Sequence, residues 1–198
     1  MKTRITQTNL LRNLSTLFLG GALLFACPGD ATAAVFAKYD GVDGESQDAN
    51  HDKWIDVLSI DWGSHKPGGG ATGQSRRRGA AVVEDLTLTM EFDRSSPKIQ
   101  EACLIGKVFP KIEIDVVANR DDTDGESFLT YKLKDVIVTS YWIIVADDGS
   151  TALQVSMSFS NLMQTHTDGE GNETTLDIDR SARDVVLTEE SVEPKRER

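Results

Sequence analysis

The sequence predicts an all-β protein, mainly β with one short helix, folded as a two-sheet β-barrel or sandwich. The first observation is that apolar and polar residues alternate with a period of two along most of the chain, most cleanly at 86–90 and 112–116. That period is typical of strands with one buried face. The second is that Gly, Asp and Asn clusters separate these segments and only one segment has helical spacing. Many short strands with one helix favour a barrel or sandwich over a parallel α/β fold.

Length and composition are those of one folded domain. The chain has 198 residues, of which 39% are hydrophobic and 27% charged, and this is enough to bury a core. The formal net charge of -11 makes nucleic acid a poor partner, because binding to phosphates requires clustered basic residues. The only such cluster in the sequence is Arg76, Arg77 and Arg78, which we interpret as solvated side chains in a glycine-rich loop.

Residues 1–33 have the features of a secretory signal peptide. Three basic residues precede the apolar stretch 14–26, and a small-x-small motif ends at Ala33. The apolar stretch is shorter than the roughly 20 residues that a membrane helix needs, so we expect no stable membrane span. We expect cleavage before Ala34 and an exported protein, either secreted or periplasmic.

Two alternatives for this segment stay open. The residues before Cys27 approximate a lipoprotein box, so a lipid anchor at Cys27 is one alternative, and an unprocessed helix is the other. Removal of Cys27 with the signal peptide would leave Cys103 alone, with no intramolecular disulfide available. Cys103 is therefore expected to be a small hydrophobic residue in the core.

The first strands of the mature chain are expected at 35–39, 54–62 and 80–92. The single helix is expected to begin at Ser95, which can cap the free amides, and to end at Gly106. Proline in the first turn is preorganised for that helix. Four residues on it have helical spacing and are expected to face the core, namely Ile99, Ala102, Cys103 and Leu104. The later strands are expected at 108–117, 128–139, 141–146 and 153–162.

Two segments depart from the strand pattern. A last strand is expected within 175–187, and 188–198 is expected to be a polar tail, so the folded domain spans 34–187. The segment 63–79 is a long glycine-rich loop, and loops of this length tend to be functional. It lacks the Lys-Ser or Lys-Thr pair of a phosphate-binding loop. We expect it to reach onto a neighbouring subunit through Gly63, Ser64, His65, Gly68, Gly69, Gly70, Arg76, Arg77 and Arg78.

No motif in the sequence predicts catalysis, a cofactor or a metal. The three histidines have no metal-ligand spacing, and the acidic residues at 121–126 fail the register of a calcium loop. Ser46, Asp48 and His51 are the residue types of a catalytic triad, but the strained turn that presents a nucleophilic serine has no counterpart here. We therefore expect a non-enzymatic protein without a cofactor.

A series of motifs carries a family resemblance. A turn formed by Gly44, Glu45, Ser46, Asp48 and His51 precedes a strand that ends in Trp-Gly at 62–63. Glu-Asp-Leu at 84–86, Asp-Arg-Ser-Ser-Pro at 93–97 and two late strands within 133–162 follow in order. This arrangement resembles the Hcp family, the tube proteins of bacterial type VI secretion systems, over about residues 35–187.

The resemblance implies a structural protein whose copies form a hexameric ring. Stacked rings would form a tube that a contractile sheath expels, so the implied partners are other copies and sheath, spike or effector proteins. The signal peptide departs from the family, whose tube proteins normally carry none. Either the protein is an exported form of the tube subunit, or the start codon is misplaced.

A monomeric exported binding module is the alternative function. Such a module would use the fold to hold a protein or a glycan. Binding of a glycan would favour exposed aromatic platforms, whereas Trp54, Trp62 and Trp142 lie in expected strands, where we expect them to pack in the core.

Overall fold

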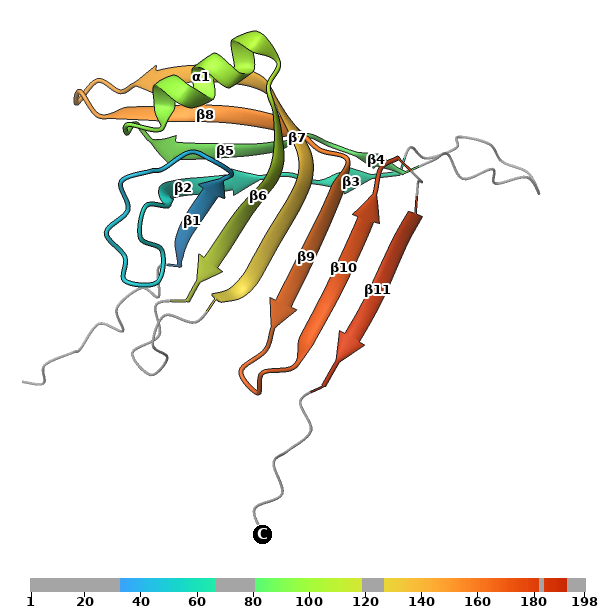
Figure 1. Ribbon diagram of the computed structural model, residues 1–198. Coiled ribbons are helices and arrows are strands. Elements are labelled where there is room, and N and C mark those ends of the chain that lie inside the picture. Colours follow the sequence, from blue (N-terminus) through green and yellow to red (C-terminus); the bar gives the residue numbers. More distant parts are fainter. Residues whose placement is uncertain (1–32, 67–80, 119–126, 182–183, 192–198) are drawn as a thin grey trace, which may run out of the picture. The chain divides into compact units, whose positions relative to one another are not determined.

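The computed structural model describes residues 33–66, 81–118, 127–181 and 184–191 (Figure 1). This part of the chain forms eleven strands and one helix, which confirms the all-β class. In chain order they are β1 (Ala34–Tyr39), β2 (Ile55–Asp61), β3 (Ser64–His65), β4 (Val82–Val83), β5 (Leu86–Glu91), α1 (Ser96–Ile105), β6 (Val108–Val117), β7 (Ser127–Val145), β8 (Thr151–Ser158), β9 (Asn161–Thr167), β10 (Glu173–Asp179) and β11 (Asp184–Glu190).

Nine of these strands form one sheet that closes on itself. The order is β11-β10-β9-β7-β6-β1-β2-β5-β8, and a further pairing of β7 with β8 joins six strands into a barrel. Closure pairs the edges that an open sheet would expose. We call the strands β9, β10 and β11, which extend the sheet beyond the barrel, the wing (Figure 1). The strands β3 and β4 form a separate two-stranded ribbon.

Strand β7 belongs to both the barrel and the wing. Its residues 129–134 pair with β9, whereas its residues 137–145 pair with β8. Between these stretches Asp135 has a φ of 49°, a left-handed conformation that bends the strand. The sequence predicted two strands here, at 128–139 and 141–146, and this was wrong because one strand continues and changes its partner.

The barrel interior is filled by alternate residues of its strands. The apolar residues of β5, β6 and β8 that face inward are fully buried, namely Leu86, Leu88, Met90, Ile112, Ile114, Leu153, Val155 and Met157. Among them lies Tyr39, whose hydroxyl donates to Met157 Sδ at 3.1 Å and whose ring meets Phe109 edge-on at 5.4 Å. Burial raises the pKa of the Tyr39 hydroxyl, because a phenolate would lose its hydration there.

Helix α1 ends as predicted, at Gly106 with a φ of 66°, but its N-cap Ser95 makes no side-chain capping bond. The Ser95 hydroxyl instead donates to Asp93 Oδ1. Ile99 and Ala102 are buried and Cys103 is half-buried. Leu104 was predicted to face the core, but its side chain is 79% exposed. It lies five residues after Ile99, which turns it to the other side of a helix with 3.6 residues per turn.

Other predicted boundaries also differ from the structure. The expected strand 80–92 is interrupted between β4 and β5, the segment 153–162 contains the end of β8 and the start of β9, and the expected strand 175–187 is the pair β10 and β11. Strand β11 also includes residues 188–190, which the sequence assigned to the tail.

Several sequence predictions lie outside the described residues. They are the signal peptide up to residue 32 with Cys27, the loop residues Gly68, Gly69, Gly70, Arg76, Arg77 and Arg78, and the acidic turn at 121–126. Within the described part of the chain, α1 is the one helix, and it is too short to cross a membrane.

Candidate functional site

The motif turn is a narrow excursion of the backbone between β1 and β2. The amide of Gly44 donates to the Lys53 carbonyl at 2.9 Å, and that of Ser46 donates to the Trp54 carbonyl at 3.0 Å. A Cβ atom on Gly44 would lie 2.1 Å from the carbonyl oxygen of Trp54. Only glycine fits this close approach of two backbones, which explains the glycine of the motif.

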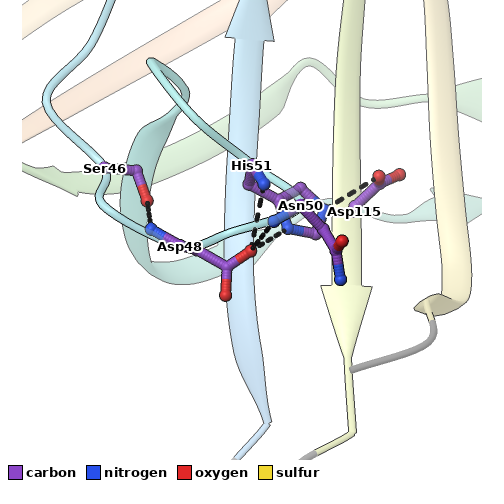
Figure 2. A network of polar contacts seen from close by, with 5 residues as sticks. All are labelled: Ser46, Asp48, Asn50, His51 and Asp115. Carbon is purple, nitrogen blue, oxygen red and sulfur yellow. Dashed lines mark hydrogen bonds and ion pairs between the residues drawn. The ribbon is translucent and has the colours of Figure 1, made fainter. Parts of the chain in front are cut away.

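His51 fixes this turn to the barrel. Its side chain is stacked on Phe36 at 4.2 Å and meets Trp54 edge-on at 4.9 Å, and the residue is only 4% exposed. Nδ1 lies 2.8 Å from Asp48 Oδ1, and Nε2 lies 3.2 Å from Asp115 Oδ2 (Figure 2). Asp48 belongs to the turn and Asp115 to β6, so the ring connects the two.

The Ser46 hydroxyl takes part in a different contact. It accepts a hydrogen bond from the amide of Asp48 at 3.4 Å, and the His51 ring bonds instead to carboxylates on both sides (Figure 2). Nucleophilic catalysis by serine requires the base to contact the hydroxyl. The hydrogen bond from His51 holds the pKa of Asp48 below its usual range. Asp48, His51 and Asp115 therefore form a structural clamp that joins the turn to β6.

Glu45 lies on the other side of the turn, beside an acidic cavity. Its amide donates to Asp93 Oδ2 at 3.1 Å, and Arg94 Nε donates to the Gly44 carbonyl at 2.9 Å. The cavity has a volume of about 400 Å³ and is lined by Glu45, Gln47, Asp56, Glu91, Phe92 and Asp93. Within the described ranges, no group of His, Cys, Asp or Glu side chains is arranged to hold a metal ion.

The predicted interface loop is described only at its base. Ser64 and His65 form β3, which pairs with β4, and both are exposed. His65 Nδ1 lies 3.0 Å from Glu84 Oε1. Gly63 accepts a hydrogen bond from the amide of Glu84 at 2.9 Å. The base is therefore a two-stranded ribbon in which the β3 side chains are exposed and Val83 of β4 packs against the core.

Sequence reasoning missed two exposed apolar strand segments. The end of β7 exposes four consecutive large side chains, of which Trp142 is 65% exposed, so the prediction that Trp142 packs in the core was wrong. Strand β11 is the last strand of the sheet in the described part, and it exposes Val186 and Leu187. Exposed apolar patches on a folded domain mark interaction sites. The run Trp-Ile-Ile-Val at 142–145 has no alternation, which was the available signal.

Comparison with known proteins gives a consistent result. The family model described as "Type VI secretion system effector, Hcp" matches residues 36–166. Protein hcp1 of Pseudomonas aeruginosa strain PAO1 is 34% identical over 106 residues, which are 54% of this chain and 65% of that protein, just under two thirds of its length.

Two solved structures extend the similarity to nearly all of the fold. The crystal structure of Hcp1 from Salmonella typhimurium is 28% identical, with a TM-score of 0.65 over 78% of this chain and 99% of that one. A type VI secretion system effector from Yersinia pestis is 26% identical, with a TM-score of 0.61 over 73% of this chain and 98% of that one.

Proposed function

The chain belongs to the Hcp family of type VI secretion system proteins, and from that membership we propose that it is a structural, non-enzymatic tube subunit whose copies form hexameric rings. The exposed apolar segments at the end of β7 and on β11 are the observation that best supports assembly. Each is a strand segment whose burial against another copy would be favourable. The resulting rings would stack into a tube.

The two segments lie on different strands, and this favours a head-to-tail contact. An interface between two different patches generates a ring when the rotation closes. The proposed interface therefore places the end of β7 in one copy against β11 of the next copy. A contractile sheath, a spike and effector proteins are the further partners that the family suggests.

We also propose that residues 1–33 are a secretory signal and that the mature domain begins at Ala34. The protein would then be secreted or periplasmic. Mass spectrometry of the protein recovered from its native host would test this, because cleavage predicts Ala34 as the first residue. A first residue inside 1–33 or an intact segment would contradict it.

The experiment that tests assembly is the native mass of the chain from Ala34, measured by light scattering over a range of concentrations. We expect a mass six times that of the monomer, together with rings in negative-stain images. Trp142→Glu and Leu187→Glu should each yield monomers, because a charge cannot be buried unpaired at the interface. Leu104→Glu is the control, since Leu104 is apolar and more exposed than Trp142 or Leu187 but lies on α1, and it should leave the ring intact.

The outcomes separate the proposals. A monomer at every concentration would refute ring formation and leave an exported binding module as the function. Rings that survive both strand variants would retain the ring and refute the proposed contact.

A further inference from the structure

The number of protons on His51 follows from its two contacts. Both ring nitrogens face carboxylate oxygens, at 2.8 Å for Asp48 and 3.2 Å for Asp115 (Figure 2). An ionised carboxylate only accepts hydrogen bonds, and a neutral imidazole has only one N–H to donate. Both contacts are hydrogen bonds only when the ring carries a proton on each nitrogen. The closed arrangement is therefore that of the charged imidazolium.

Within the described part of the chain, two charged groups contact the ring, and both are carboxylates. The charged groups that face it are Asp48 from its own turn and Asp115 from β6. Phe36 of β1 stacks on the ring. Across the sheet, Asp56 of β2 and Asp115 of β6 lie opposite Phe36 on its two sides, and Thr130 of β7 lies opposite Asp115. We call these four residues the cross-strand row of Phe36.

Among the described residues, His51 is the one basic partner of Asp48 and of Asp115. In the ion pairs of the described residues, no lysine or arginine contacts Asp48 or Asp115. The ring is almost completely buried, whereas the side chains of Asp48 and Asp115 are 41% and 19% exposed. Water can therefore reach the two carboxylates but has little access to the ring nitrogens, and an unpaired buried polar group is costly.

We propose that His51 is a pH-operated latch for the turn 43–54, which holds the turn to β6 when charged and releases Asp115 when Nε2 loses its proton. Nδ1 keeps its proton because its contact is the shorter one and lies within the turn, where Asp48 Oδ1 also accepts the amides of Asn50 and His51. The Nε2 lone pair would then face the Asp115 carboxylate, which is repulsive.

The test is hydrogen exchange of the full chain by mass spectrometry, with rates converted to protection factors. Between about pH 5.5 and about pH 8.5, which bracket the usual histidine range, protection of peptides covering 43–54 should fall about tenfold, as expected for loss of one charge-assisted hydrogen bond. Peptides from β6 should not change. Equal protection of the turn at both pH values would overturn the proposal.

Two carboxylate variants isolate the contact. Asp115→Asn should remove the pH dependence, because an amide can accept from the charged ring and donate to the neutral one. Asp56→Asn is the matched control in the same cross-strand row and should behave as wild type. An Asp115→Asn protein with the wild-type pH dependence would refute the role of Asp115.

A second measurement covers the case in which Asp115→Asn does not fold. The ¹⁵N chemical shifts of the His51 ring in the wild-type protein distinguish the imidazolium from each neutral tautomer. We expect both nitrogens to be protonated while the turn is protected, and Nε2 to lose its proton as protection falls. A neutral ring in the protected state would overturn the latch, and so would deprotonation without loss of protection.

Discussion

Replacement of Gly44 by alanine tests the packing of the motif turn. The added Cβ would lie 2.1 Å from the carbonyl oxygen of Trp54 and 2.6 Å from its carbonyl carbon. Both are backbone atoms, so no side-chain rotation can relieve the overlap. The two segments must separate, and this breaks the hydrogen bonds that join Gly44 to Lys53 and Ser46 to Trp54.

The loss of stability follows from these contacts. These two hydrogen bonds at about 1 kcal/mol each, together with about 1 kcal/mol of residual steric strain, give a decrease in the free energy of unfolding of about 3 kcal/mol. For a domain of this size, that decrease lowers Tm by about 6–12 °C. Urea denaturation followed by tryptophan fluorescence would measure the free energy, and calorimetry would measure Tm.

Gly169→Ala is the control for this substitution. A Cβ atom there meets nothing within 4 Å, so the variant should differ from wild type by less than about 0.5 kcal/mol. A Gly44→Ala protein as stable as wild type would refute the close approach of the two backbones. Equal destabilisation by both variants would show that the effect is not specific to the turn.

Three further substitutions test the point where β7 changes its partner strand, the wing and the core. Asp135→Ala should lower the free energy of unfolding by about 1–2 kcal/mol, measured in urea, because alanine tolerates a φ of 49° poorly. Asp135→Gly should lower the free energy of unfolding by less. Arg180→Ala should raise hydrogen exchange in the wing several-fold, because Arg180 lies over the Phe159 ring at 5.1 Å and pairs with Asp85 at 3.5 Å; unchanged exchange would contradict this. Tyr39→Phe should lower the free energy of unfolding only slightly near neutral pH. The difference from wild type should shrink above about pH 10, because the tyrosine then ionises in the unfolded state only. A difference that is independent of pH in urea titrations would refute the raised pKa of the Tyr39 hydroxyl.

The sequence predicted those strands whose inner face is apolar along their whole length. Alternation at 86–90 and 112–116 corresponds to β5 and β6. The alternation did not reveal where β8 ends, because Phe159 in the turn after β8 is buried and continues the apolar pattern into β9. It also could not show that β7 changes partner at Asp135, because pairing depends on register with strands far away in the chain.

The same limit applies to the turn at 43–54. The motif residues were recognised in the sequence, and the structure shows the close backbone approach at Gly44 and the two carboxylate contacts of His51. Asp115 was missed because it is 64 residues from His51 and occupies an ordinary polar position in an alternating strand. Only the pairing of β6 with β1, which places Asp115 opposite Phe36, brings it to the histidine ring.

The distribution of apolar residues connects stability to assembly. The barrel strands are paired on both sides and, apart from the exposed end of β7, bury their inner faces. Most of the barrel is therefore expected to be stable within one chain. Strand β11 differs, because Val186 and Leu187 are consecutive and point to opposite faces, yet they are 51% and 60% exposed. This strand therefore buries little apolar surface within one chain, and such elements open most easily. Contact with a second copy would bury that surface, so order in β11 and formation of the ring are expected to depend on each other.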